Sequence, residues 1–381
     1  MISFAFPYTA ILIKARLGVS IGVVGLILGG TTVAGLPLQL VGGTLSDRVG
    51  RRSVMIVCAL GSALMYGGLA FAHQVWLVVL CVFCDRALGW PMYLTASNAM
   101  VADLTRERLR AEGFGIVRLV ISAGTVVGPL VSAALLAAGF TIPFLFGLAG
   151  GGCLVFLALT LIFLKESRPA AVPPPAATEP RARAGHATVL RDGRFLAFCA
   201  ASLLPLFIFG QLYSTYPVLI TGVLGVKAGT WGLLVAFNAL VIVVFQYPVV
   251  KWLKRFDGMV QIALACLLFG IGVGAVAFIA PGWPLLTTIF VVALAQAVFS
   301  PVSSAIVGEM APEHLRGRYM GVWTLVWTGG LSALGPIGGG LLMDALGPHG
   351  SYAALILLGV AGMVLFAALR GRERLRVGFA S

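Results

Sequence analysis

Twelve apolar runs follow one another along this chain, and they constrain its fold more than any other feature. A bilayer core of about 30 Å needs about 20 apolar residues per helical crossing. Runs of this length fit membrane helices far better than alternating barrel strands. The sequence therefore predicts an all-α integral membrane protein whose runs lie at roughly 1–13, 20–43, 54–73, 75–101, 113–138, 141–164, 195–220, 229–250, 258–280, 283–308, 319–344 and 350–369.

Composition agrees with a membrane environment. The 381 residues are 60% hydrophobic and only 10% charged, whereas soluble domains carry roughly 25% charged residues. The net charge of +13 gathers between the apolar runs, where it reports topology rather than a nucleic-acid-binding face. We therefore expect the lipid bilayer, and no nucleic acid, as a partner.

The stretch 165–194 differs from the rest of the chain. It holds three consecutive prolines, several alanines and six basic residues, a composition typical of an extended linker. We predict an N-terminal six-helix half at 1–164, this linker at 165–194, a C-terminal six-helix half at 195–370 and a tail at 371–381.

An internal repeat supports the two-half organisation. The segment Ala102–Arg110 resembles Gly308–Arg316 at an offset of 206, and Gly128-Pro129 corresponds to Gly335-Pro336 at an offset of 207. The halves therefore descend from one six-helix unit, which predicts a pseudo-two-fold repeat with the substrate path between its copies.

Basic residues in the loops predict the orientation. If the linker is cytoplasmic, its side of the membrane holds 21 of the 26 lysines and arginines, and the opposite side holds only Lys14, Arg16 and Lys227. The positive-inside rule then places the linker and the C-terminus in the cytoplasm. The expected location is a plasma membrane, specifically a bacterial inner membrane.

The first run is shorter than the others. Thirteen helical residues span about 20 Å, less than the thickness of the hydrocarbon core. We therefore predict that helix 1 is incomplete, either because the chain is truncated or because its start is misassigned.

The loop after the second run carries a specific motif. In this motif two glycines flank an aspartate and an arginine, and two further arginines follow: Gly43, Leu45, Ser46, Asp47, Arg48, Gly50, Arg51 and Arg52. The pattern resembles G-x-L-A-D-R-x-G-R-R, the signature of the major facilitator superfamily between helices 2 and 3. The resemblance covers the whole chain and implies the twelve-helix fold of that family.

The resemblance also implies a cytoplasmic gate. An aspartate at a helix end can pair with the positive N-terminus of a neighbouring helix, and the arginines can bridge to acids at other helix ends. Asp103 is the nearest such acid. The alternative is an ordinary positively charged topology loop.

A second motif lies in the fifth run. Antiporters of the resembled family carry G-x8-G-x3-G-P-x2-G-G there, and this chain has Gly115, Gly124, Gly128 and Pro129 at those spacings but lacks the last two glycines. The resemblance implies a pivot in a proton-coupled exporter. Mere close packing of helices uses the same residues and stays an alternative.

Charges inside the runs mark possible proton pathways, since charges at membrane depth are costly. Asp85, Arg86 and Arg118 are the candidate proton-coupling residues. Burial favours the neutral form of Asp85, while a neighbouring arginine favours its charged form. The alternatives are a static Asp85–Arg86 pair, or an Asp85 that faces the packing side of its helix.

Mildly polar and aromatic side chains at inward-facing spacings form the candidate substrate cavity. Such a cavity would accept amphipathic or cationic molecules, although isolated Gln and Ser often only bond neighbouring helices. The candidates are Tyr93, Ser122, Phe207, Gln211, Ser214, Asn238, Gln296 and Ser300.

Other chemistry is not predicted. A nucleotide-binding Gly-Lys-Ser/Thr loop is missing, and the histidines and cysteines form no spacing typical of a metal site; Cys81-x-x-Cys84 is more simply a buried pair. We expect no enzyme activity, no cofactor and no metal.

The leading hypothesis is a monomeric, proton-coupled exporter of small lipophilic or cationic molecules. The alternatives are an uptake symporter or facilitator for a sugar, organic anion or amino acid, and a membrane scaffold or sensor without transport activity.

Overall fold

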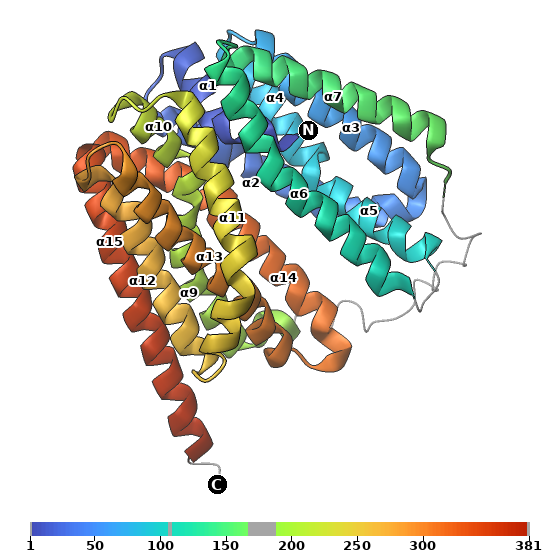
Figure 1. Ribbon diagram of the computed structural model, residues 1–381. Helices are drawn as coiled ribbons and strands as arrows, with labels where there is room; N and C mark the ends of the chain where they lie inside the picture. Colours follow the sequence, from blue (N-terminus) through green and yellow to red (C-terminus); the bar gives the residue numbers. More distant parts are fainter. Residues whose placement is uncertain (1, 106–108, 167–187, 379–381) are drawn as a thin grey trace. The chain divides into compact units, whose positions relative to one another are not determined.

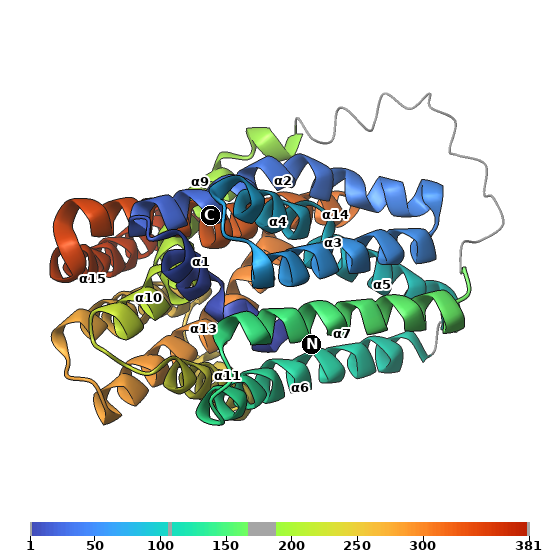
Figure 2. The same ribbon diagram turned by 90° about the horizontal axis from the view of Figure 1, so that it is seen from above.

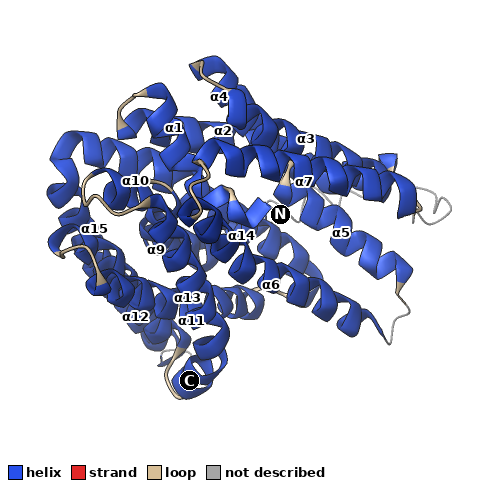
Figure 3. Cartoon of the chain, turned by 45° about the horizontal axis from the view of Figure 1, so that its top comes forward, coloured by secondary structure: helices blue, strands red, loops and turns tan. Residues whose placement is uncertain are grey.

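The computed structural model is built of helices joined by short loops (Figure 3). It describes residues 2–105, 109–166 and 188–378, with side chains left aside at 40–48, 91, 110–111 and 371–378. Most of the predicted linker and the end of the predicted tail therefore lie outside the described residues. Within the described part, ten segments are long and apolar enough to cross a membrane.

The chain divides into two compact units, which are described separately. Unit 1 comprises residues 1–19, 26–177 and 227–236, and unit 2 comprises residues 20–25, 178–226 and 237–381. Each unit includes a short segment from outside the corresponding predicted half.

The first part of the chain supplies the helices of unit 1 (Figure 1). Two short 3-10 turns, η1 (Ile2–Phe4) and η2 (Phe6–Tyr8), precede α1. The α-helices are α1 (Thr9–Leu17), α2 (Ile21–Val49), α3 (Arg51–Phe71), α4 (Val75–Leu88), α5 (Trp90–Leu104), α6 (Arg110–Ala137) and α7 (Ile142–Phe163).

The core of unit 1 lies where α3 packs against α4, α5 and α7, and Figure 2 shows α3 and α7 side by side. Its centre is rich in sulfur-containing side chains from α3 and α5, which fill irregular gaps well. The buried members of this cluster are Val54, Met55, Cys58, Met92, Ala96 and Met100.

The second part of the chain supplies the helices of unit 2, and it also supplies the start of α11, residues 228–236, which belongs to unit 1. The helices of this part are α9 (Gly193–Gly210), η4 (Gln211–Tyr213), α10 (Thr215–Gly222), α11 (Ala228–Leu253), α12 (Gly258–Gly274), η5 (Ala275–Phe278), α13 (Trp283–Met310), η6 (Glu313–Leu315), α14 (Arg316–Thr328), the π-helical η7 (Gly329–Leu334) and α15 (Gly335–Gly378).

Aromatic rings dominate the core of unit 2. The ring of Phe299 lies 5.6 Å from Trp327 and 6.0 Å from Phe269, and Phe198 lies 5.6 Å from Trp323 and 6.0 Å from Phe366. These contacts join α9, α12, α13, α14 and α15, and α12 and α15 lie side by side in Figure 1.

Five predicted runs are not single α-helices. The run 1–13 consists of η1, η2 and the start of α1, and the run 258–280 passes from α12 into η5. The run 75–101 breaks between α4 and α5 at Gly89, two residues before Pro91, which has no N–H for the helix ladder. The run 195–220 passes through the 3-10 turn η4, and the run 319–344 contains η7. The last two predicted runs are joined at a kink. Gly347 has a non-helical φ of 68° there, and Pro348 follows it.

Candidate functional site

The start of α3 gathers charged groups from three elements of unit 1. The Arg51 Nε donates to Asp103 Oδ2 at 3.2 Å, and both side chains are largely buried. The backbone N–H of Arg51 donates to Glu166 Oε1 at 2.8 Å, and that of Arg52 donates to Glu166 Oε2 at 3.2 Å. A carboxylate at a helix N-terminus is favourable because it satisfies free N–H groups and complements the helix dipole.

These contacts bring together two of the predicted gate residues, Arg51 and Asp103. Arg52 instead donates through Nη2 to the carbonyl of Leu161, 2.7 Å away at the end of α7. Gly50 precedes α3 with a φ of 108°. The predictions on Gly43, Asp47 and Arg48 fall on side chains outside the described ones.

Sequence reasoning missed Glu166. It lies three residues after the end of α7, at the start of the stretch whose composition predicts a linker. The available signal was an acidic residue directly after an apolar run, at a place where a neighbouring helix would begin.

Asp85 is buried in unit 1, with 6% of its surface exposed. Its Oδ1 accepts a hydrogen bond of 3.1 Å from the Ser62 hydroxyl of α3. The carboxyl group therefore faces the α3–α4 packing surface, one of the alternatives that the sequence left open.

Arg86 points in another direction. Its guanidinium lies 5.7 Å from the centre of the Phe6 ring, and its Nε finds no hydrogen-bond partner among the described residues. The Tyr66 hydroxyl is also buried without such a partner in the described part of the chain. Asp85 and Arg86 thus have different contacts although they are adjacent in sequence, because neighbouring helical residues point about 100° apart.

The small-residue face of α6 contacts the N-terminal segment. The Ser3 hydroxyl donates to the carbonyl of Gly124 at 2.6 Å. A Cβ on Gly128 would lie 3.0 Å from the Phe4 nitrogen and would collide with Ser3. The Ser132 hydroxyl lies 3.3 Å from the buried hydroxyl of Tyr8. Glycine at position 128 therefore permits a close backbone approach.

The beginning of α11 joins the same cluster. The buried Trp231 indole donates to the Pro7 carbonyl at 2.9 Å. A Cβ on Gly232 would lie 2.8 Å from the Pro129 carbonyl and would collide with the Tyr8 hydroxyl. Gly115, by contrast, has open space around it, so the motif positions differ in how tightly they pack.

Arg118 and Ser122 lie on the first half of α6. Arg118 is exposed, and the Ser122 carbonyl accepts from the Thr125 hydroxyl at 2.7 Å. Tyr93 packs between α5 and α7, with its ring 5.6 Å from Phe156. Tyr93 therefore lies at the edge of the unit 1 core, and its role in a substrate cavity stays a prediction.

Gln211 and Ser214 of unit 2 are fully engaged inside the protein. The Gln211 side chain donates to the carbonyls of Phe207 and Gly335 at 2.8 and 2.9 Å, and its oxygen accepts from Thr215 at 2.9 Å. The Ser214 hydroxyl donates to the carbonyl of Gly210 at 2.9 Å. This geometry favours a structural bridge between η4 and the start of α15 over the predicted substrate contacts.

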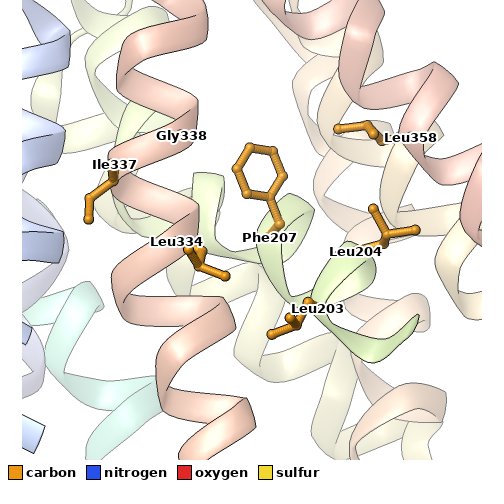
Figure 4. A pocket seen from close by; sticks show the side chains of 7 residues that line it. All are labelled: Leu203, Leu204, Phe207, Leu334, Ile337, Gly338 and Leu358. Atoms are coloured by element: carbon orange, nitrogen blue, oxygen red, sulfur yellow. The ribbon is translucent and has the colours of Figure 1, made fainter. Parts of the chain in front are cut away.

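Phe207 lines an apolar cavity of about 370 Å³ between α9 and the end of η7 and α15. Figure 4 shows its ring projecting between Ile337 and Leu358. This volume falls within the range of ligand pockets. The lining offers contact to lipophilic groups and no charged group to orient a ligand; it consists of Leu203, Leu204, Phe207, Leu334, Ile337, Gly338 and Leu358.

Two further candidates keep unpaired polar atoms. Asn238 Nδ2 and Gln296 Oε1 are buried and have no hydrogen-bond partner among the described residues. An unpaired buried polar atom is costly, which distinguishes these two side chains from the fully bonded Gln211. Ser300, one turn after Gln296, has a carbonyl that accepts from Ser303 and Ser304.

Comparison with known proteins decides the family. The model of the Major Facilitator Superfamily matches residues 1–287 and 232–379. The chain belongs to the Major Facilitator Superfamily. The resemblance and the all-α membrane fold predicted from the sequence are thus confirmed, and the protein is a multi-pass membrane transporter.

Curated relatives in the superfamily have diverse names. The chain is 27% identical to the multidrug resistance protein MdtH of Cronobacter sakazakii, over 95% of this chain and 88% of the relative. It is 26% identical to the uncharacterized MFS-type transporter YqjV of Bacillus subtilis, over 91% and 83%. It is 24% identical to a Na(+), Li(+), K(+)/H(+) antiporter of Planococcus maritimus, over 85% and 82%.

Solved structures support the major facilitator fold. A mutant of the nucleoside transporter NupG matches with a TM-score of 0.78 at 14% identity, over 97% of this chain and 96% of that one. A mutant of the peptide transporter POT matches with a TM-score of 0.76 at 19% identity, over 98% and 92%.

Within this superfamily transporter, the sites differ in their chemistry. The start of α3 carries charged groups, α4 carries the buried carboxyl group of Asp85, and unit 2 carries the unpaired polar atoms of Asn238 and Gln296. Among the described residues, no group of three or more His, Cys, Asp or Glu side chains is placed to hold a metal ion.

Proposed function

We propose that this transporter is a proton-coupled exporter of small lipophilic or cationic molecules. The observation that carries the proposal is the packing of α6. Its Gly124–Ser132 face, which matches most of the antiporter motif, lies directly against the N-terminal segment and the start of α11. The names of the MdtH and cation/H(+) antiporter relatives support the same class.

In this proposal Asp85 carries the proton. It is an acid within a candidate membrane span, and its carboxyl group accepts a hydrogen bond from the Ser62 hydroxyl. Arg86 and Arg118 adjust its protonation or contact the substrate. One proton that crosses about 100 mV releases about 2.3 kcal/mol, enough for roughly a fiftyfold gradient of a neutral substrate.

The substrate would contact Asn238 and Gln296, whose unpaired polar atoms are the strongest support for a binding role in unit 2. Alternating access requires a gate on the linker side, and we assign it to Gly50 and the start of α3 together with Asp103. The transporter would act as a monomer in a bacterial inner membrane, with its linker and C-terminus in the cytoplasm.

Transport in inverted membrane vesicles tests the proposal. Vesicles that contain the protein should accumulate a lipophilic cationic dye only when a proton gradient is applied, and collapse of the gradient should abolish accumulation. Gradient-driven uptake into right-side-out cells would instead establish an importer and refute export.

Substitution of Asp85 tests the proton site. Asp85→Asn should abolish coupled transport and leave membrane insertion intact, because the amide cannot exchange a proton. The matched control is Glu309→Gln, which neutralises an exposed acid at the end of α13 and should leave coupling unchanged. Unaltered proton-driven transport in the Asp85 variant would refute its role.

A further inference from the structure

Basic and aromatic side chains crowd the end of α11 in unit 2. We call Lys251, Trp252, Lys254, Arg255 and Phe256 the α11 patch. All five side chains are exposed, including 58% of Trp252 and 42% of Phe256. The candidate membrane span of α11 runs from Ala228 to Leu253, so the patch straddles the point where the span leaves the hydrocarbon.

The arginine of the α11 patch is held in a defined position. Its guanidinium lies 4.0 Å from the centre of the Trp252 ring and 5.0 Å from that of Phe256. The two rings also contact each other, with centres 5.9 Å apart. Stacking on aromatic faces orients an arginine and leaves its N–H edge free to bind an anion in bidentate fashion.

The positive charges of the α11 patch are not neutralised by protein acids. None of its three bases forms an ion pair with another described residue. The nearest acid in the sequence, Asp257, is occupied elsewhere: its Oδ1 accepts from the Met259 N–H at 2.9 Å, and its Oδ2 lies 3.7 Å from Arg370 Nε. The patch therefore presents three uncompensated charges beside an aromatic surface.

We propose that the α11 patch binds the phosphate headgroup of an anionic phospholipid. Tryptophan is enriched at the membrane–water interface, and clustered lysines and arginines beside a membrane helix attract anionic lipids. At this depth the exposed rings would lie against acyl chains, while Arg255 and the two lysines reach the phosphate. Charge complementarity and the position at the end of a span favour a lipid over a soluble anion.

The alternative is that these basic residues only set the orientation of the helices in the membrane. The two hypotheses make different predictions. Membrane orientation depends on charge alone, whereas a lipid-binding site also depends on the aromatic ring that holds Arg255. Substitutions that keep the charge but remove the stacking geometry therefore separate them. Lipid binding is measured without transport, so the result does not depend on the proposed export function.

The experiment compares full-length variants by native mass spectrometry after purification with phosphatidylglycerol and phosphatidylcholine. The wild-type protein should retain more phosphatidylglycerol than phosphatidylcholine. Each base contributes about 1 kcal/mol of attraction, so each of Lys251→Gln, Lys254→Gln and Arg255→Gln should weaken retention about fivefold. The matched control neutralises three bases from other loops, Arg191, Arg316 and Arg318, and should retain phosphatidylglycerol like the wild type.

Two charge-conserving variants give the sharper readout. Trp252→Ala and Arg255→Lys should both weaken retention, and Trp252→Phe should restore it because a ring remains under the guanidinium. Full retention in both Trp252→Ala and Arg255→Lys would overturn the proposal. So would equal loss in the control variant, or displacement of the lipid by millimolar inorganic phosphate, which would identify a soluble-anion site.

Discussion

Two helices in this transporter differ in how the free N–H groups of their first turns are bonded. α3 in unit 1 and α12 in unit 2 each begin with N–H groups that lack partners inside the helix. α3 begins after Gly50, which has no side chain, and Glu166 from the end of α7 accepts the N–H groups of Arg51 and Arg52. α12 begins after Asp257, which caps its own helix through the Met259 N–H.

The partners of the two acids are arranged differently as well. In unit 1 the acid lies after the last helix of the predicted half, and the helix that it caps supplies Arg51 to a second acid, Asp103. In unit 2 the capping acid lies on the capped helix, and the residue near the end of the last span is a base, Arg370.

The difference has a mechanical consequence. A cap supplied by another element ties α3 to the end of α7, so separation of the two elements breaks it. A cap supplied from within keeps α12 intact whatever its neighbours do. The contacts at the start of α3 can therefore form and break as the proposed gate closes and opens. The start of α12 is suited to a helix that does not change its contacts.

Alanine at Gly50 should give the largest effect. Gly50 has a φ of 108° and a ψ of 150°, a region open essentially to glycine alone, and a Cβ there would collide with the Glu166 carboxylate. Gly50→Ala should cost on the order of 1–3 kcal/mol from backbone strain, lower the apparent Tm in detergent and reduce dye export.

The matched variant is Gly258→Ala in the first turn of α12. A Cβ there would lie 3.1 Å from the terminal Cδ1 of Ile306, a side-chain end that can shift. We expect a small change in apparent Tm and normal export. Equal loss of stability in both variants would contradict the contrast between the two helix starts.

Removal of the capping acids should give an intermediate effect. Glu166→Ala and Asp257→Ala each remove a cap of about 0.5–2 kcal/mol. Hydrogen exchange should accelerate in the first turn of α3 and also at the end of α7 in the Glu166 variant. In the Asp257 variant the acceleration should be strongest in the first turn of α12, because the contact with Arg370 that is also lost is a long, partly exposed ion pair. An unchanged α7 end in the Glu166 variant would show that the cap does not join the two elements.

The contrast also shows what sequence reasoning could reach. Hydropathy alone located the spans, because each run must bury about 20 residues in lipid. The pairing of Arg51 with Asp103 was anticipated because the loops that carry them precede and follow neighbouring runs. The role of Glu166 was not anticipated. A single acidic residue in a proline-rich stretch gives the same sequence pattern whether it caps a helix or faces water.

Other features depend on rotation and on neighbours, which composition does not encode. The sequence left open which way Asp85 faces, and only the Ser62 hydroxyl reveals that it lies against α3. Gln211 has the polarity expected of a substrate contact, yet the altered helix at η7 places the Gly335 carbonyl within its reach. The breaks at Gly89 and η4 likewise follow from local packing within runs that remain uniformly apolar.

Breaking either of the two ion pairs should give the smallest change in stability. The difference between the two changes tests the contrast between the helix starts. Arg51 Nε and Asp103 Oδ2 are 3.2 Å apart with side chains 11% and 19% exposed, whereas Arg370 Nε and Asp257 Oδ2 are 3.7 Å apart with side chains 32% and 38% exposed. Exposed pairs contribute about 0–1 kcal/mol and are screened by salt. Double-mutant cycles with Arg→Gln and Asp→Asn should therefore give a larger coupling in apparent stability for Arg51–Asp103, and that coupling should resist added salt. If the Arg370–Asp257 coupling is equal or larger, the extra restraint at the α3 start comes from Glu166 alone, and the gate would be held by a helix cap rather than by an ion pair.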